Sequence, residues 1–411
     1  MKVLIVNASD ISGGAARAAN RLHRALLNQG IESQMLVQSK TGNLQSVVTG
    51  DKPLEKACGR VRPFLDSLPA KRYEQKTKTL FSPAWVPSEI VRRINEINPD
   101  IVHFHWINSG MLPVKDIPKI KAPIVWSLHD MWAFTGGCHY DENCGLFRTT
   151  CGSCPVLGST KSRDLSYWIQ KKKEKAFSSK SDLYFIGLSN WMANAASESR
   201  LLQGKTVLAL PNPIDTGFFS KVEKDIARDL LGLPQDSRLV LFGAMNATGD
   251  PRKGFAELSG ALNLLEDEQV ELVVFGASGD SQDNDFKQKV HFLGQLNDDL
   301  SLKILYSAAD VMVVPSLQEN LSNAIMESMS CGTPVVAFAI GGNGDMIDHL
   351  ETGYLASPFD IKDLARGIEW VLNQGVKEGA GKRAAESVRD RFDSRLVANQ
   401  YIEMYTEILS K

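Results

Sequence analysis

The chain has 411 residues, of which 43% are hydrophobic and 23% are charged. One hydrophobic core rarely serves so long a chain, and two domains are therefore expected. The first residues lack the long apolar core and cleavage site of a signal peptide, and no apolar run approaches the roughly 18–20 residues that span a bilayer. These features predict a soluble, cytoplasmic protein that contacts a membrane only peripherally, at its inner face.

The net charge of −2 is unevenly distributed along the chain. Residues 1–205 carry 28 Lys+Arg against 17 Asp+Glu, whereas the remainder carries 18 against 31. A basic half favours an anionic partner, such as lipid head groups of a membrane or a phosphorylated acceptor. A solvated basic face without a partner explains the charge equally well. The sequence shows no recognition helix or aromatic RNA-binding signature, so a nucleic-acid partner is not expected.

In chain order, short apolar runs alternate with stretches of helical spacing. A helix is expected at 15–29, where Gly30 would end it. Strands are expected at 2–8, 34–38, 101–105, 124–128 and 183–188, and a second set follows at 206–210, 239–243, 272–275, 311–315 and 334–338. Such alternation predicts parallel sheets with helices on both faces.

Because the pattern restarts, we predict an α/β fold of two doubly wound, Rossmann-like domains that face each other across a cleft. The first domain would cover 1–205 and the second 206–385, with the boundary near 204–213. The amphipathic stretch 384–409 predicts a long helix, which makes 386–411 a candidate to cross back to the first domain. Ligands of open α/β sheets bind at the carboxyl ends of the strands, so the cleft is the expected active site.

A glycine-bearing turn follows the first expected strand. Gly13 and Gly14 would let the backbone approach a ligand closely, and the helix that follows would favour a phosphate at its N-terminus. A tight turn without any ligand would have the same sequence. The spacing is not the G-x-G-x-x-G of dinucleotide-binding proteins, which argues against an NAD-dependent enzyme.

Residues 310–344 contain a strand, a polar loop, a helix and a second strand. Glu319 lies in the loop and Glu327 lies in the helix expected at 321–330, with seven residues between them. A carboxylate can accept two hydrogen bonds from a vicinal diol, so this pair suits a ribose and a sugar hydroxyl. Between them, a pyrophosphate would suit the amide groups at the helix start, at Leu321, Ser322 and Asn323.

Glu319-x7-Glu327, followed by Cys-Gly-Thr-Pro-Val-Val and Gly-Gly, resembles the donor-site signature of glycosyltransferase family 4. The resemblance extends over nearly the whole chain. It implies a GT-B fold in which the first domain binds the acceptor and the second binds a nucleotide-sugar donor. It also implies that Glu319 lies against the transferred sugar and that Glu327 binds the ribose.

The same resemblance implies a basic pair that holds the donor diphosphate. The family has an arginine shortly after a strand that ends in glycine, but here Gly243 is followed by Ala244 and Met245. Lys253 matches the family lysine, and we take its neighbour Arg252 as the substitute for the missing arginine. Two cations would neutralise the leaving diphosphate as the glycosidic bond breaks.

Three further segments fall in the family's order. Residues 290–294, with Phe292 and Leu293, resemble the segment whose backbone meets the nucleobase, and 211–215 matches the interdomain turn. His129, at the end of an expected strand, occupies the place of a histidine near the donor sugar, so we expect it to bind the sugar or shape the reaction centre. His103 and His105 are either site residues or ordinary packing residues.

Four of the six cysteines, Cys138, Cys144, Cys151 and Cys154, lie within a Cys-rich loop at 138–154. In a reducing cytosol these thiolates favour a structural zinc ion with a closed coordination sphere, rather than a catalytic one. Two disulfides, or free thiols with His139 as a substitute ligand, are the alternatives. The neighbouring residues 132–140 resemble a subset of bacterial family 4 enzymes of polysaccharide synthesis, where such a loop would border the acceptor side of the cleft.

Taken together, the resemblance implies a retaining glycosyltransferase of hexosyltransferase type. It would move a sugar from a nucleotide-sugar donor to a saccharide or lipid-linked saccharide acceptor in surface polysaccharide biosynthesis, without a cofactor for catalysis. Two other functions fit the same fold: a nucleotide-sugar hydrolase or epimerase, and a catalytically silent nucleotide-sugar binding protein.

Overall fold

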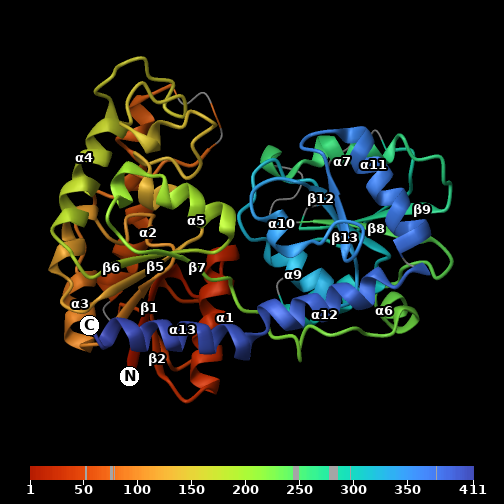
Figure 1. Cartoon of the computed structure of the whole chain (residues 1–411), viewed down its shortest axis with the longest axis horizontal. Coiled ribbons are helices and arrows are strands. Elements are labelled where there is room, and N and C mark those ends of the chain that lie inside the picture. Colours follow the sequence, from red (N-terminus) through yellow and green to blue (C-terminus); the bar gives the residue numbers. More distant parts are fainter. Residues whose placement is uncertain are drawn as a thin grey trace. The chain divides into compact units, whose positions relative to one another are not determined.

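The computed structural model describes residues 1–50, 53–74, 77, 79–243, 250–276, 286–296, 298–375 and 377–411. The chain forms two compact units (Figure 1). Unit 1 comprises Met1–Pro213 together with Val397–Lys411, and unit 2 comprises Ile214–Leu396.

Unit 1 is built on a sheet of seven strands, in the order β3-β2-β1-β4-β5-β6-β7, in which every pair is parallel. Strand order reverses between β1 and β4, which makes this the switch point of a doubly wound sheet. The strands are β1 Lys2–Ser9, β2 Glu32–Ser39, β3 Val47–Val48, β4 Ile101–Phe104, β5 Ile124–Leu128, β6 Leu183–Gly187 and β7 Val207–Ala209.

Helices cover both faces of this sheet. They are α1 Gly14–Asn28, α2 Pro53–Ser67, α3 Ile90–Ile97, α4 Leu165–Ser178, α5 Asn190–Ser197 and α13 Ser394–Leu409, with short 3-10 turns η1 Ala70–Arg72, η2 Val114–Lys119, η3 Trp132–Phe134, η4 Leu146–Arg148 and η5 Arg200–Leu202. One apolar cluster joins α1 and α13 to β1, β4, β5 and β6, through residues such as Leu22, Val397, Ile5 and Val125. The C-terminal helix is therefore part of the core of unit 1.

The border between the units differs from the expected one. We expected residues 206–210 to open the second domain, but β7 pairs with β6, where Phe185 is opposite Val207, and it forms the edge of the first sheet. Unit 1 therefore continues to Pro213, within the expected interdomain turn. An isolated apolar run indicates a strand, but it does not indicate which sheet the strand joins.

Unit 2 has a six-stranded parallel sheet in the order β10-β9-β8-β11-β12-β13, with its switch point between β8 and β11. Its strands are β8 Arg238–Gly243, β9 Val270–Phe275, β10 Val290–Phe292, β11 Val311–Val314, β12 Val335–Phe338 and β13 Gly353–Ala356. Its helical segments are α6 Lys224–Leu231, η6 Pro251–Lys253, α7 Phe255–Leu262, α8 Asp299–Ala308, α9 Asn323–Ser330, α10 Asn343–Met346, α11 Ile361–Trp370, the π-helical turn η7 Val371–Gly375 and α12 Ala380–Phe392.

The prediction of two Rossmann-like domains with parallel sheets is confirmed, but the single long helix expected at 384–409 is wrong. The chain forms α12 and α13, which are separated at Asp393, where φ is −53° and ψ is 138°. This extended residue accepts the hydroxyl hydrogen of Thr216 on its carboxylate, and its neighbour Ser394 donates its N–H to the carbonyl of Ile214. The contacts with the segment at 214–216 accompany the break in the helix, and amphipathic spacing alone does not reveal them.

Within the described part of the chain, no helix is long and apolar enough to cross a bilayer.

Candidate functional site

The site predicted in unit 2 lies at the carboxyl edge of its sheet, beside the switch point. β8 ends at Gly243 and β11 ends at Val314, and these two strands are neighbours. The polar loop after β11 carries Glu319, and α9 carries Glu327 in its second turn. A ligand of a doubly wound sheet binds at such an edge, because loops on both sides of the switch point open away from each other.

Lys253 and Glu319, both predicted site residues, are in contact. The Nζ of Lys253 lies 3.3 Å from Oε2 of Glu319, and the two side chains are 30% and 13% exposed. The Ser316 hydroxyl also donates to Oε2 at 3.4 Å, and the backbone N–H of Asn320 donates to Oε1 at 3.3 Å. The carboxylate is thus held in place, while the ammonium retains surface with which to meet an anion.

Close backbone contacts fix the loop that presents Glu319. Gly341 has a φ of +51°, and a Cβ added there would lie 1.8 Å from the carbonyl oxygen of Glu319. Gly254, which follows Lys253, has a φ of +73°, and its Cβ would lie 1.9 Å from the carbonyl oxygen of Pro315. Only glycine allows both the left-handed conformation and the close approach. Gly341, the first glycine of the family's Gly-Gly pair, therefore allows the loop with Glu319 to adopt this conformation.

Arg252 is oriented differently from its neighbour. Its guanidinium donates to both carboxylate oxygens of Asp250, at 3.1 Å and 2.7 Å, and holds the pKa of that carboxyl below its usual range. In this structure Arg252 is paired with Asp250, and its binding to a diphosphate stays a prediction. Ala244 and Met245, which stand where the family has its arginine, lie outside the described residues.

Glu327 is 3% exposed, and a residue that sequence reasoning missed holds it. Tyr306, on α8 and 1% exposed, donates its hydroxyl to Oε2 of Glu327 at 2.8 Å. The Tyr306 ring packs edge-on against Phe275, whose ring would lie 2.2 Å from a Cβ at Gly243. The glycine that ends β8 therefore makes room for the aromatic contact behind Glu327. Nothing in the local sequence around Tyr306 indicates this role.

The start of α9 is close to the prediction. The helix begins at Asn323 rather than Leu321, with Ser322 as N-cap, and the Ser322 side chain makes no capping hydrogen bond. Leu321 and Ser322 are buried, at 7% and 9% exposure. This two-turn helix begins four positions after Glu319, at Asn323. The positive end of its dipole would favour an anion near that carboxylate.

The segment predicted to meet a nucleobase forms β10, at the edge of the sheet. Phe292 is half-buried against the apolar core of unit 2. The N–H of Leu293 donates to the carbonyl of Val274 at 2.9 Å, so this group is occupied within the sheet. A base would have to meet this segment through other atoms.

In unit 1, His129 lies at the carboxyl end of β5 and is hydrogen-bonded to a second histidine. Its Nε2 is 2.8 Å from Nδ1 of His105, which follows β4, and the two rings are 5.1 Å apart at their centroids. Burial lowers the pKa of His129 to about 4, and the pKa of His105 falls well below 6.5, chiefly through burial. Both imidazoles are therefore neutral near pH 7, which suits His129 for hydrogen bonding and not for acid catalysis.

Asp130, the residue after His129, accepts hydrogen bonds from two aromatic side chains and one backbone group. It accepts hydrogen bonds from His139 Nδ1 at 2.6 Å and from the Trp106 indole at 3.1 Å, and its neighbour Trp132 donates a backbone N–H at 2.9 Å. His139 lowers the pKa of Asp130. His139 is thus committed to Asp130 and to the Ser82 hydroxyl, which excludes it as the substitute metal ligand considered above.

The glycine turn after β1 forms the entry to α1. Gly13 is the N-cap residue, with a φ of 97°, and Gly14 is the first helical residue. The space where a Cβ of Gly13 would stand is open. Asp10 of this turn is buried and accepts hydrogen bonds from Thr41 and from the N–H of Gly42 at 2.7 Å, so it ties the turn to the loop after β2.

The predicted zinc site is not supported. In the described part of the chain no group of three or more His, Cys, Asp or Glu side chains is arranged to hold a metal ion. Cys138, Cys144, Cys151 and Cys154 are free thiols, so the alternative of two disulfides is also wrong. Cys138 and Cys154 pack among apolar residues such as Phe81 and Ile169, and burial raises the pKa of Cys151 to about 12. Cys58 lies among residues whose side chains the structure does not describe.

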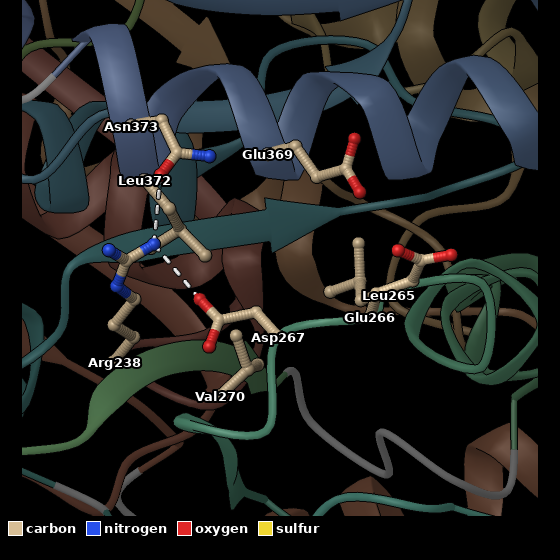
Figure 2. Close-up of a pocket in the computed structure, with 8 residues that line it drawn as sticks. All are labelled: Arg238, Leu265, Glu266, Asp267, Val270, Glu369, Leu372 and Asn373. Atoms are coloured by element: carbon tan, nitrogen blue, oxygen red, sulfur yellow. Dashed lines mark hydrogen bonds and ion pairs between the residues drawn. The ribbon is translucent and has the colours of Figure 1, made fainter.

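A pocket elsewhere in unit 2 does not coincide with this site. Figure 2 shows it around Arg238, which donates to Asn373 at 2.9 Å and pairs with Asp267 at 2.9 Å. Arg238 and Val270 begin β8 and β9, so the pocket lies at the amino edge of the sheet. The carboxyl edge, where ligands of this fold class bind, is the opposite one.

Comparison with known proteins identifies the family of the chain. The family model described as Glycosyltransferase Family 4 matches residues 12–218, half of the chain. The family model described as Glycosyl transferases group 1 matches residues 236–374. An uncharacterized glycosyltransferase of Methanocaldococcus jannaschii is 32% identical over 194 residues, which are 44% of this chain and 48% of the relative. The phosphatidyl-myo-inositol mannosyltransferase of Mycobacterium leprae is 26% identical over 341 residues, 80% of this chain and 78% of the relative.

This chain thus spans about half the length of the first of these relatives. Among solved structures, HepE of Anabaena in complex with UDP-glucose covers 99% of this chain and 100% of its own, with a TM-score of 0.65 and 19% identity. That likeness concerns the fold, which is GT-B. Because the family description covers half of the chain and the donor signature of unit 2 stands at the carboxyl edge of its sheet, the chain belongs to glycosyltransferase family 4.

Proposed function

We propose that this protein transfers a sugar from a nucleoside diphosphate sugar to a hydroxyl of an acceptor, with retention of anomeric configuration. The observation that carries the proposal is the contact between Lys253 and Glu319 beside the switch point, with Glu327 held by Tyr306 in the helix that follows. A carboxylate for the sugar, a cation for the diphosphate and a second carboxylate for the ribose are the groups such a donor needs.

In this proposal the diphosphate leaves toward Lys253 and the N-terminus of α9. The bond between the anomeric carbon and the phosphate oxygen breaks, its electron pair departs with the diphosphate, and the ammonium and helix amides stabilise the charge that develops. The acceptor hydroxyl attacks from the same face and passes its proton to the departing phosphate oxygen. The step requires no metal and no cofactor.

His129 contributes a neutral imidazole to the reaction centre. An imidazole with a pKa of about 4 is almost entirely neutral at pH 7. His129 therefore offers hydrogen bonds to the sugar rather than acid catalysis. His105 is hydrogen-bonded to His129, and the next residue, Asp130, is itself held by His139.

We further propose a UDP-sugar donor, supported by the fold shared with HepE, which was solved with UDP-glucose. A thermal-shift screen of the full chain against UDP-, GDP-, ADP- and TDP-sugars, repeated with Glu327→Ala, tests this. Stabilisation by the UDP class, lost in the variant, is expected. Stabilisation by another base would correct the donor. Nucleotide binding without any acceptor-dependent product would instead favour a silent binding protein, and sugar release in water would favour a hydrolase.

For the acceptor we propose a saccharide or a lipid-linked saccharide of polysaccharide or glycolipid synthesis, in keeping with the lipid named for the mycobacterial relative. α2 and the turn after it support a peripheral membrane contact. Val61 and Phe64 are 51% and 57% exposed, and the exposed bases Lys71 and Arg72 follow them. Apolar side chains beside bases are typical of segments that lie on anionic bilayers.

Sedimentation with liposomes that contain anionic lipid tests this contact at low salt. Val61→Asp combined with Phe64→Asp should reduce the bound fraction several-fold, because two apolar anchors become anionic. Leu300→Asp replaces an equally exposed leucine of unit 2 and serves as control. Equal binding of all three proteins, or no binding by the unmodified one, would exclude α2 as a membrane contact.

A further inference from the structure

Two tyrosines of the C-terminal helix reach the strands that carry the histidines of unit 1. The hydroxyl of Tyr405 lies 2.6 Å from Nδ1 of His103 on β4, and Nε2 of His103 lies 2.8 Å from the hydroxyl of Ser127 on β5. The Ser127 hydroxyl in turn lies 3.4 Å from that of Tyr401, which donates to the carbonyl of Leu210 at 3.4 Å. His103, Ser127, Tyr401 and Tyr405 are each no more than 1% exposed.

The carbonyl of Leu210, at one end of this series of hydrogen bonds, determines the direction of each bond in the series. The Leu210 carbonyl can only accept, so Tyr401 donates its one hydroxyl hydrogen there and must accept from Ser127. Ser127 then accepts from His103, whose Nε2 carries the proton. Burial lowers the pKa of His103 to about 3, so the ring is neutral and its Nδ1 accepts from Tyr405. Tyr405 remains protonated, because burial raises its pKa well above 10.

His103 continues the connection toward His129. Its ring is tilted against that of His105, two residues along the same strand face, with the centroids 4.5 Å apart. His105 Nε2 is buried without a hydrogen-bond partner among the described residues. Leaving an unprotonated ring nitrogen there without a partner costs less free energy than leaving an N–H group without an acceptor. The proton of His105 is therefore on Nδ1, from which it is donated to Nε2 of His129.

We propose that Tyr405 is a positioning residue for His129, acting through the His103 ring and the adjacent ring of His105. The C-terminal helix thereby sets the orientation of the imidazole at the carboxyl end of β5, with His103 protonated on Nε2 and both His105 and His129 protonated on Nδ1. The consequence for catalysis rests on the proposed function, whereas the tautomers and ring positions do not.

The test is ¹⁵N NMR of the full-length protein with labelled histidine, assigned by single His→Gln variants of the seven histidines. The unmodified protein should show the three tautomers given above. Tyr405→Phe removes one hydroxyl and should shift the imidazole resonances of His103, His105 and His129. It should also lower kcat by about 10-fold, the scale of a small misplacement, with the donor KM within about twofold.

Ile408→Ala, on the same buried face of α13, is the matched control for a loss of stability alone. It should lower Tm without moving the His129 resonance. If Tyr405→Phe behaves like this control, or if His103 carries its proton on Nδ1, the proposal is overturned. Ser127→Ala removes the acceptor at Nε2 of His103 and gives the same readout should Tyr405→Phe not fold. An unmodified protein without transferase activity would refute the proposed function, while the resonances would still decide the positioning role.

Discussion

Tyr306 donates its hydroxyl to Oε2 of Glu327 at 2.8 Å, and both side chains are almost fully buried. A buried carboxylate is costly unless it is hydrogen-bonded, so this contact offsets part of the cost of burying Glu327 and holds its side chain in place. Twenty-one residues separate the two in the chain, and the contact exists only because α8 and α9 pack together.

Tyr306→Phe should therefore weaken binding of the donor more than it slows the chemical step. A hydrogen bond to a charged group contributes about 1.5 kcal/mol or more, which corresponds to about a 10-fold rise in donor KM. Steady-state kinetics with the donor that the thermal-shift screen selects measure it. Tyr354→Phe removes a hydroxyl bonded to Asp363 in the same unit and serves as control. A donor KM equally affected by both changes would contradict a specific role for Tyr306.

Glu319→Gln and Lys253→Ala should each reduce kcat by about 100-fold or more. Lys253→Ala removes the cation proposed to stabilise the departing diphosphate, and Glu319→Gln removes the carboxylate charge proposed to act at the transferred sugar. Lys382→Ala, which removes an exposed lysine paired with Glu386 at 3.8 Å, should leave kcat unchanged. Product formation followed by chromatography at saturating donor measures the effect. The assignment fails if both site variants retain sugar transfer.

Gly341→Ala should lower both Tm and kcat. The new Cβ would lie 1.8 Å from the Glu319 carbonyl oxygen, at a φ of +51° that alanine tolerates poorly, so the loop with Glu319 must move. Gly344→Ala is the matched control, since no atom lies within 4 Å of its Cβ position. Thermal unfolding and initial rates of both variants would reveal the difference, and equal values would show that the loop adapts freely.

The buried neutral histidines should make the protein sensitive to acid. Burial lowers the pKa of His23 to about 4 and that of His103 to about 3, whereas both rings titrate near pH 6.5 in the unfolded chain. Below about pH 6.5 the unfolded state binds more protons, so the free energy of unfolding should fall as the pH decreases toward 4. Urea denaturation at a series of pH values measures the slope.

His23→Gln should reduce that slope by about one proton, because one titrating group is lost. His349→Gln, at an exposed position, is the matched substitution for comparison. A free energy of unfolding that is constant between pH 4 and 6.5 would contradict the neutral state of the buried rings.

The cysteines should behave as thiols rather than as zinc ligands. Burial raises the pKa of all four thiols, and Cys144 is the most accessible of them. Alkylation of the native protein near pH 7.5 should therefore reach Cys144 before the other three, as peptide mapping by mass spectrometry would show. A chelator should leave Tm unchanged. One equivalent of zinc per chain, released with a fall in Tm, would reinstate the metal site.

The sequence by itself determined the positions of most strands of both sheets, with β3, β10 and β13 as the exceptions. The apolar runs of β1, β5 and β11 identify strands that are buried on both faces, because such strands have no polar alternation. Glu319, Glu327 and Lys253 could be assigned because they match motifs of the family, which are local stretches of sequence. His129 was assigned in the same way, from its match to a family histidine at the end of a strand.

Only the tertiary structure decided which distant groups meet. Tyr405 and His103 are 302 residues apart, and β7 joined the first sheet because β6 offered its edge. The bidentate pair of Arg252 and the burial of Cys138, Cys151 and Cys154 also depend on packing that sequence spacing does not encode. The spacing of apolar residues along the sequence indicates whether a segment is a helix or a strand and which of its faces is buried. A hydrogen bond between side chains far apart in the sequence depends instead on how the helices and strands pack.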